Sequence, residues 1–106
     1  PQTWPPSMSE PSATRTVIIG NRQGLHARAA VLLAELARRF ESKIELVTAD
    51  RRRVLTTEVL QTLSLGCAEG EQVELVATGR DAEAALEAIA DLFARKFDEE
   101  TETSDH

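Results

Sequence analysis

Hydrophobic and polar positions repeat with two different periods along this chain, and the two periods separate helices from strands. Apolar residues recur every three or four positions after residue 27 and again after residue 82, which is typical of helices with one buried face. A shorter helical run from residue 58 ends before Gly66, which is well placed to terminate it. The segments before and between these helical runs are rich in β-branched residues or alternate polar and apolar residues, and both patterns predict strands. The predicted elements are strand 14–20, helix 27–40, strand 43–48, strand 52–56, helix 58–65, strand 71–77 and helix 82–97.

The order of these elements, βαββαβα, indicates the fold class. Strands 43–48 and 52–56 are separated by a short turn, so they are expected to form a hairpin. Hairpins imply antiparallel pairing, and alternating strands imply that one face of the sheet is buried. Thr57 and Asp81 are the N-caps that we expect for the second and third helices. The sequence therefore predicts a two-layer, open-faced α/β (α+β) sandwich, in which a four-stranded, mostly antiparallel sheet is covered on one face by three helices.

The charged residues are distributed unevenly between the ends and the middle of the chain. The net charge is −6, but residues 14–97 hold twelve acids and twelve bases. Residues 1–13 are rich in Pro and Ser, and residues 98–106 carry five acids and no Lys or Arg. Both compositions are typical of disorder. We therefore predict a disordered N-terminal lead at 1–13, one folded domain at 14–97 and a disordered acidic tail at 98–106.

Composition also excludes several classes of function. A neutral domain with few aromatic residues lacks the basic face and the stacking side chains with which proteins bind nucleic acids. No apolar run reaches about 18 residues, so we expect no membrane insertion. The single cysteine, Cys67, excludes an internal disulfide and a multi-thiolate metal site, and it favours a cytoplasmic setting. We expect a monomer that needs no metal or other cofactor of its own.

His26 is the residue best placed to carry chemistry. It lies between a Gly-containing loop and the first turn of the predicted helix 27–40. A helix N-terminus presents backbone N–H groups, here those of Ala27 and Arg28, together with a partial positive charge, and this combination binds phosphate. Arg28 adds a permanent cation. These residues suit a nucleophilic imidazole that carries a phosphoryl group, although a histidine before a helix is more often a simple cap or loop residue.

The segment from Gly24 to Ala30, GLHARAA, resembles the active-site motif of the HPr family, the histidine-containing phosphocarriers of the bacterial phosphoenolpyruvate-dependent phosphotransferase system. The resemblance extends over residues 14–97, and the family has the same open-faced sandwich. It implies that His26 is phosphorylated on Nδ1 and that Arg28 contacts the phosphoryl group. It also implies that the backbone N–H groups of Ala27 and Arg28 are the donors at the helix end.

Two positions depart from the family pattern. Ala29 stands where the sugar-transporting branch usually has Pro, and the nitrogen-related regulatory branch is more similar at this one position. Glu58 stands where many relatives have a regulatory serine, so control by the serine kinase is absent at this position. Glu58 is either a helix-start acid, which the helix dipole favours by about 0.3–1 kcal/mol, or a weak, permanent imitation of a phosphoserine.

A partner surface is expected next to this site. Val31 shares its helical face with Arg28, so it should be an exposed apolar residue. On the short second helix, the pattern leaves open which of Val59, Leu60 and Leu63 face the core and which are exposed. A small apolar patch beside the arginines of the first helix would suit docking to acidic partner surfaces.

The resemblance implies a phosphoryl carrier rather than a free-standing enzyme. Such a carrier accepts the phosphoryl group on His26 from phosphorylated enzyme I and passes it to a IIA-type domain, for sugar uptake or for its regulation. Two alternatives remain open: a carrier of the nitrogen-related regulatory branch, and a module on the same scaffold that acts only by binding. The presence of His26 and Arg28 argues against the binding-only module, whereas Glu58 argues slightly for it.

Overall fold

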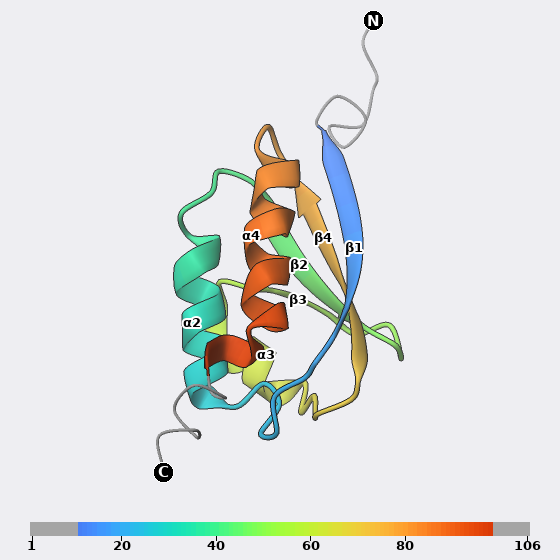
Figure 1. The fold of residues 1–106 in the computed structure, drawn as a ribbon. Coiled ribbons are helices and arrows are strands. Elements are labelled where there is room, and N and C mark those ends of the chain that lie inside the picture. The colour runs from blue at the N-terminus through green and yellow to red at the C-terminus, as the bar shows by residue number, and fades with distance from the viewer. Residues whose placement is uncertain (1–10, 99–106) are drawn as a thin grey trace, which may run out of the picture.

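The computed structural model describes residues 11–98 (Figure 1). Within this range the chain forms four strands and three α-helices in the predicted order, followed by a short 3-10 helix. Residues 1–10 and 99–106, which contain most of the predicted lead and tail, lie outside the described residues. The elements are β1 (Ser12–Ile18), α2 (Ala27–Ala37), β2 (Lys43–Thr48), β3 (Arg53–Leu55), α3 (Val59–Ser64), β4 (Gln72–Thr78), α4 (Ala82–Ala94) and the 3-10 helix η1 (Lys96–Asp98).

Neighbouring strands of the sheet are all antiparallel, in the spatial order β1-β4-β2-β3. β4 is an inner strand, whose Leu75 pairs with Arg15 of β1 on one side and with Leu46 of β2 on the other. β2 and β3 form the predicted hairpin. The helices cover one face of the sheet, and α2 and α4 lie side by side in front of it (Figure 1). This architecture confirms the predicted open-faced sandwich.

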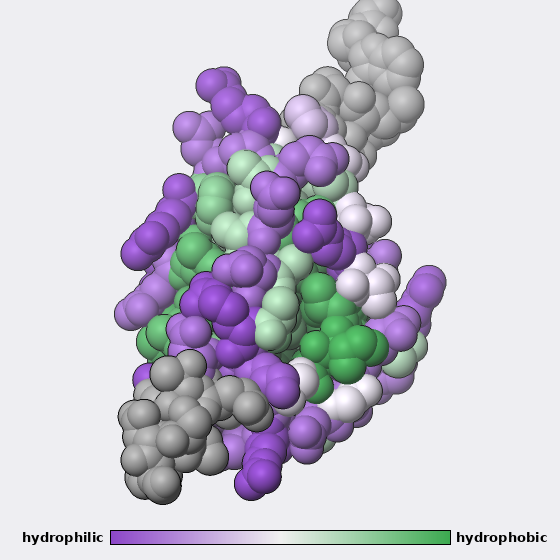
Figure 2. Space-filling model, viewed as in Figure 1, coloured by the Kyte–Doolittle hydropathy of each residue, from purple (hydrophilic) through white to green (hydrophobic). Residues whose placement is uncertain are grey.

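The core lies between the sheet and the helices and is mostly aliphatic. Every second residue of β4, from Val73 through Leu75 to Ala77, is buried in it. Its largest fully buried side chain is Phe97, whose ring meets that of Phe93 edge to face at a centroid distance of 4.9 Å. The outward surface of the two long helices is largely hydrophilic (Figure 2), as expected for amphipathic helices that cover a sheet.

Several predicted boundaries are wrong by two or three residues. β1 begins at Ser12 rather than at residue 14, because Ser12 pairs with Thr78 and the N–H of Gly79 donates to the Pro11 carbonyl. α2 ends at Ala37 rather than at residue 40, because the N–H groups of residues 39 and 40 donate to carbonyls only three residues back. β2 has its predicted bounds, and β3 and β4 are shifted by single residues at their ends.

The two predicted helix caps are also corrected. The N-cap of α3 is Glu58 rather than Thr57. Asp81 does occupy the N-cap position of α4, but its carboxylate accepts hydrogen bonds from the Ser42 hydroxyl and from the N–H groups of Glu41 and Ser42 instead of from its own helix. These bonds, above all that from the Ser42 hydroxyl, hold the pKa of the Asp81 carboxyl below its usual value. Asp81 thus ties the start of α4 to the loop before β2.

α4 ends three residues before the predicted residue 97, because the chain turns sharply after Arg95. Lys96, Phe97 and Asp98 have left-handed backbone conformations, with φ of 56°, 55° and 63°. The turn brings Phe97 back into the core, where it is fully buried. Arg95 supports it through ion pairs to Asp91 at 2.8 Å and to Asp98 at 2.9 Å.

Candidate functional site

His26 occupies the N-cap of α2, as the sequence predicts. Its backbone is extended, and its carbonyl accepts the hydrogen bond of the Ala30 N–H at 2.9 Å. The ring also faces the helix, because Nδ1 accepts a hydrogen bond from the N–H of Arg28 at 3.2 Å. A ring nitrogen that accepts a hydrogen bond carries no proton. Nδ1 therefore holds a lone pair, and it lies in front of the positive end of the helix.

The electrostatics at this end of α2 favour an anion. The first turn contains no acidic residue, and the N–H groups of residues 27–29 precede that of Ala30, which donates to the N-cap carbonyl. Ala27 and Arg28 are exposed, whereas Ala29 is buried against the core. Arg28, in this first turn, adds a permanent positive charge. Backbone N–H groups and a guanidinium can therefore hold a phosphoryl oxygen here together.

The loop before His26 is fixed by hydrogen bonds that the sequence did not reveal. Asn21 is buried, and its Nδ2 donates to the Gly24 carbonyl at 2.6 Å. The N–H of Gly24 donates back to the Asn21 carbonyl at 3.1 Å, which closes a turn. Leu25 then enters the core, and its N–H donates to the Cys67 carbonyl at 3.1 Å. The loop after α3 thus supports the residues that place the histidine.

Gly24 is required where these two loops cross. Its φ is +65°, in the left-handed region that favours glycine. A Cβ at this position would lie 2.3 Å from the carbonyl oxygen of Cys67 and 2.9 Å from the Cα of Ala68. Both are backbone atoms, so a change of side-chain rotamer cannot relieve the contact. The Gly in the sequence motif is therefore explained by packing of backbone on backbone.

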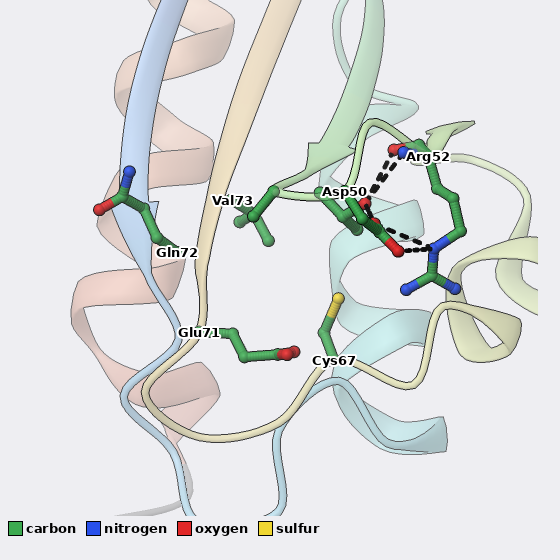
Figure 3. A pocket seen from close by; sticks show the side chains of 8 residues that line it. Asp50, Arg52, Cys67, Glu71, Gln72 and Val73 are labelled. Carbon is green, nitrogen blue, oxygen red and sulfur yellow. Dashed lines mark hydrogen bonds and ion pairs between the residues drawn. The ribbon is translucent and has the colours of Figure 1, made fainter.

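A pocket of about 420 Å³ lies next to this crossing, and the side chain of Cys67 points into it (Figure 3). Asp50 and Arg52, from the turn after β2, and Glu71, just before β4, also line it. Arg52 pairs with Asp50 at 3.0 Å and donates to the Leu65 carbonyl at 3.2 Å. Burial raises the pKa of the Cys67 thiol, which keeps the thiol protonated near neutral pH. Cys67 therefore serves the site through its backbone carbonyl.

The predicted partner residues divide into exposed and half-buried ones. Val31 on α2 and Leu60 on α3 are exposed apolar side chains, at 41 % and 80 %. Val59 and Leu63 are half-buried. The two helices that carry these residues contact each other. The structure thus decides which α3 side chains face solvent, and we call Val31 and Leu60 the apolar docking residues.

Glu58 is exposed at the N-cap of α3 and makes no capping hydrogen bond to that helix. Its own N–H donates to the Leu55 carbonyl at 3.0 Å. Arg38, at the end of α2, donates to the carbonyl of Thr57 at 3.4 Å, so a basic side chain lies beside the residue before Glu58. A charge at the start of α3 fits both interpretations of Glu58, the helix-start acid and the imitation of a phosphoserine.

Other ligand-binding groups are few in the described part of the chain. Among residues 11–98, no three His, Cys, Asp or Glu side chains are placed to hold a metal ion. In the same range, no helix is both long enough and apolar enough to cross a membrane. At the start of α2, the His26 Nδ1 lone pair and backbone N–H groups come together, and Arg28 belongs to the first turn of the same helix.

This geometry supplies one half of a transfer reaction. His26 offers a nucleophilic lone pair and the helix end offers a site for an anion, while the group to be transferred and its leaving group come from another molecule. Such an arrangement suits the class of carriers that accept a group from one molecule and pass it to another.

Comparison with known proteins identifies the family. The family model "PTS HPr component phosphorylation site" matches residues 13–95. The chain is 44 % identical over 86 residues to the phosphocarrier protein HPr of Treponema pallidum, covering 81 % of this chain and 97 % of that protein. It is 44 % identical over 85 residues to the phosphocarrier protein NPr of Shewanella violacea, covering 80 % and 92 %. The crystal structure of HPr from Thermoanaerobacter tengcongensis, 37 % identical, matches with a TM-score of 0.78 and covers 82 % of this chain and 97 % of that one.

The chain therefore belongs to the HPr family, and it is a phosphoryl carrier of the phosphotransferase system. This confirms the family resemblance that the GLHARAA segment indicated. The relatives carry both the HPr and the NPr name, so they do not separate the sugar branch from the nitrogen branch.

Proposed function

We propose that His26 is the residue that bears the phosphoryl group of this carrier, and that the bond forms at Nδ1. His26 receives the group from phosphorylated enzyme I and passes it to a IIA-type domain. The observation that supports this most strongly is the hydrogen bond from the Arg28 N–H to Nδ1. That bond distinguishes the nitrogen with the lone pair from the other ring nitrogen, and it places the lone pair at the end of α2.

The transfer is a displacement at phosphorus. The Nδ1 lone pair attacks phosphorus while the bond from phosphorus to the donor breaks, and the electron pair of that bond leaves with the donor. Nδ1 gives up its hydrogen bond in the same step, so the Arg28 N–H becomes available to a phosphoryl oxygen. The Arg28 guanidinium and the positive end of α2 then stabilise the negative charge of the bound group. Transfer to the acceptor reverses these steps.

The apolar docking residues, Val31 and Leu60, provide a surface that both partners use in turn. The donor and the acceptor must each reach His26, so the same exposed side chains serve two interfaces. Arg28 and Arg38 favour partners whose matching surfaces are acidic. The carrier works as a cytoplasmic monomer, catalyses no reaction alone and needs no cofactor of its own. Light scattering, with a dimer as the contrary outcome, tests the monomer.

Intact-mass analysis after incubation with enzyme I, Mg²⁺ and phosphoenolpyruvate tests the role of His26. We expect one acid-labile phosphoryl group on the unaltered chain and none on His26→Ala. His26→Asn is the matched control for folding, because Asn is a good N-cap but has no ring nucleophile. It should keep the fold and also remain unphosphorylated. Phosphorylation of either variant would place the group on another residue, and an unphosphorylated native chain would favour the binding-only module.

The nitrogen-related branch is a second candidate within the same function. Ala29 after the motif arginine favours it, while one HPr relative and one NPr relative are each 44 % identical to this chain. Rates of phosphorylation by enzyme I of the sugar type and of the nitrogen type, measured at equal concentration, should differ by about tenfold or more, which corresponds to about 1.4 kcal/mol of discrimination. Equal rates would leave Ala29 without a role in choosing the partner.

A further inference from the structure

A buried amide side chain, that of Asn21, lies at the start of the loop that leads to His26. Asn21 is only 1 % exposed, and its Nδ2 donates to the Gly24 carbonyl at 2.6 Å. Burial of an amide costs free energy that hydrogen bonds must offset, whereas a leucine has the same shape and no polar atoms. The amide is therefore better explained by the hydrogen bond that it makes than by the space that it fills.

The Asn21 hydrogen bond fixes one side of the peptide group between Gly24 and Leu25. The carbonyl oxygen of this group accepts from Asn21, and its N–H, which belongs to Leu25, donates to the Cys67 carbonyl at 3.1 Å. A trans peptide group is planar and its C=O and N–H point in opposite directions, so the two bonds together fix its orientation. Gly24 restricts that orientation little by itself, because glycine has many accessible backbone conformations.

The orientation of this peptide group determines how the chain enters α2. Only Leu25, whose side chain is buried in the core, separates the fixed peptide group from His26. The backbone of His26 is extended, with φ of −79° and ψ of −178°, and its Nδ1 accepts the Arg28 N–H at 3.2 Å. That distance is at the long end of the range for hydrogen bonds, so a small rotation of the ring would break the bond.

The same hydrogen bond keeps a carbonyl oxygen away from the anion site. The Gly24 oxygen is directed at the side chain of a buried residue, whereas Ala27 and Arg28, at the start of α2, are exposed. A carbonyl oxygen carries a partial negative charge, so it would repel a phosphoryl group if it turned toward the helix end. Asn21 thus holds this oxygen in the interior.

We propose that Asn21 is a positioning residue for phosphoryl transfer. Its amide holds the peptide group between Gly24 and Leu25, and through it the His26 ring, in the orientation in which Nδ1 faces the start of α2. This inference rests on the proposed role of His26 and adds the residue that orients the nucleophile. Because Asn21 is buried, it acts through this peptide group rather than by contact with a partner. A displacement of a reacting group by about 1 Å can slow a reaction about 100-fold.

Asn21→Leu tests this role in the full-length protein, because it replaces the amide by methyl groups of the same shape. Thr56→Val is the matched control, since Thr56 is also fully buried and its hydroxyl donates to a backbone carbonyl, that of Ile44, at 2.9 Å. On the folded fraction of Asn21→Leu, we expect kcat for phosphorylation by enzyme I to fall about 10- to 100-fold. KM should stay within about twofold, because the apolar docking residues are unchanged. Thr56→Val should match the native chain in both constants.

The nitrogen-15 resonances of His26 Nδ1 and of the Arg28 amide give a readout that does not depend on phosphorylation. Both should move in Asn21→Leu and stay in place in Thr56→Val. Unchanged resonances or an unchanged kcat in Asn21→Leu would overturn the inference. If the native chain is not phosphorylated, the role of His26 fails instead, while the resonances still decide whether Asn21 orients the ring. If Asn21→Leu does not fold, Asn21→Ala, which adds no bulk, takes its place in the same comparisons.

Discussion

Gly24→Ala tests whether the crossing of two loops positions His26. The mutation adds one methyl group at a backbone with φ of +65°, 2.3 Å from the Cys67 carbonyl oxygen and 2.9 Å from the Cα of Ala68. That carbonyl accepts the Leu25 hydrogen bond, so the chain must move apart where it is held together. Gly66→Ala is the matched control, because Gly66 has φ of +64° but no atom within 4 Å of the added Cβ.

The two variants share one loss in the free energy of unfolding, and Gly24→Ala has a second loss that Gly66→Ala lacks. A left-handed backbone costs a residue with a Cβ roughly 1–2 kcal/mol relative to glycine, and both variants incur it. Overpacking against atoms that cannot rotate away adds about 1–3 kcal/mol in Gly24→Ala only. The total, about 2–5 kcal/mol, is a large part of the roughly 4–13 kcal/mol that a domain of this size has. We therefore expect Gly24→Ala to melt at least about 4 °C below Gly66→Ala.

Urea unfolding, followed by circular dichroism, measures the difference in the free energy of unfolding. Rates of phosphorylation, measured on the folded fraction, show whether His26 has also moved. We expect a slower reaction in Gly24→Ala and a normal one in Gly66→Ala. If the two variants were equally stable to within about 0.5 kcal/mol and were phosphorylated equally fast, the close approach of Gly24 to Cys67 would have no part in holding the site.

Three further outcomes follow from other parts of the structure. Phe97→Ala removes a fully buried ring and should cost about 3–5 kcal/mol in urea unfolding, whereas the half-buried Phe40→Ala should cost clearly less; equal losses would contradict the docking of the last turn in the core. Leu60→Ser should change stability by no more than about 0.5 kcal/mol, because the side chain is 80 % exposed, yet raise the KM for enzyme I about tenfold; an unchanged KM would remove Leu60 from the docking surface. Hydrogen bonds from Ser42 and Glu41 lower the pKa of Asp81 in the folded state. Their contribution to the free energy of unfolding is therefore present above about pH 3.9 and is lost as the pH falls through the folded pKa. Asp81→Asn should therefore lower stability at pH 7 and make it depend less on pH below about 4, and an unchanged acid profile would contradict this.

The order of elements and the placement of the histidine could be predicted because both depend on near neighbours. Helical spacing and strand alternation are local periods, so the succession βαββαβα followed from them. His26 and Arg28 stand at the start of the first helix, and a cap needs only the residues around it. The exposure of Val31 followed from the helical face that it shares with Arg28.

What could not be predicted depends on contacts between distant segments. The partners of Asp81 are 39 and 40 residues away in the sequence, so its position before a helix suggested a side-chain cap that does not form. The last helix stops early because burial of Phe97 outweighs the unfavourable left-handed turn. The motif contained Gly24 but gave no sign of its contact with Cys67. The pattern of α3 left open whether Leu60 or Leu63 is exposed, because six residues are too few to define one face.

The position of β1 in the sheet also bears on how the protein is made. β1 precedes the rest of the domain in the chain but pairs with β4, so that Ile18 lies opposite Gln72 and Ser12 lies opposite Thr78. A ribosome that adds about 5–20 residues per second needs roughly 3–13 s between the partners of these pairs. During that interval the β2–β3 hairpin can close, whereas the β-branched segment around Ile18 has no strand beside it. The nascent chain therefore has an unpaired, aggregation-prone first strand until β4 has left the exit tunnel. The yield of folded protein in the cell should depend on whether another molecule covers that strand during this interval.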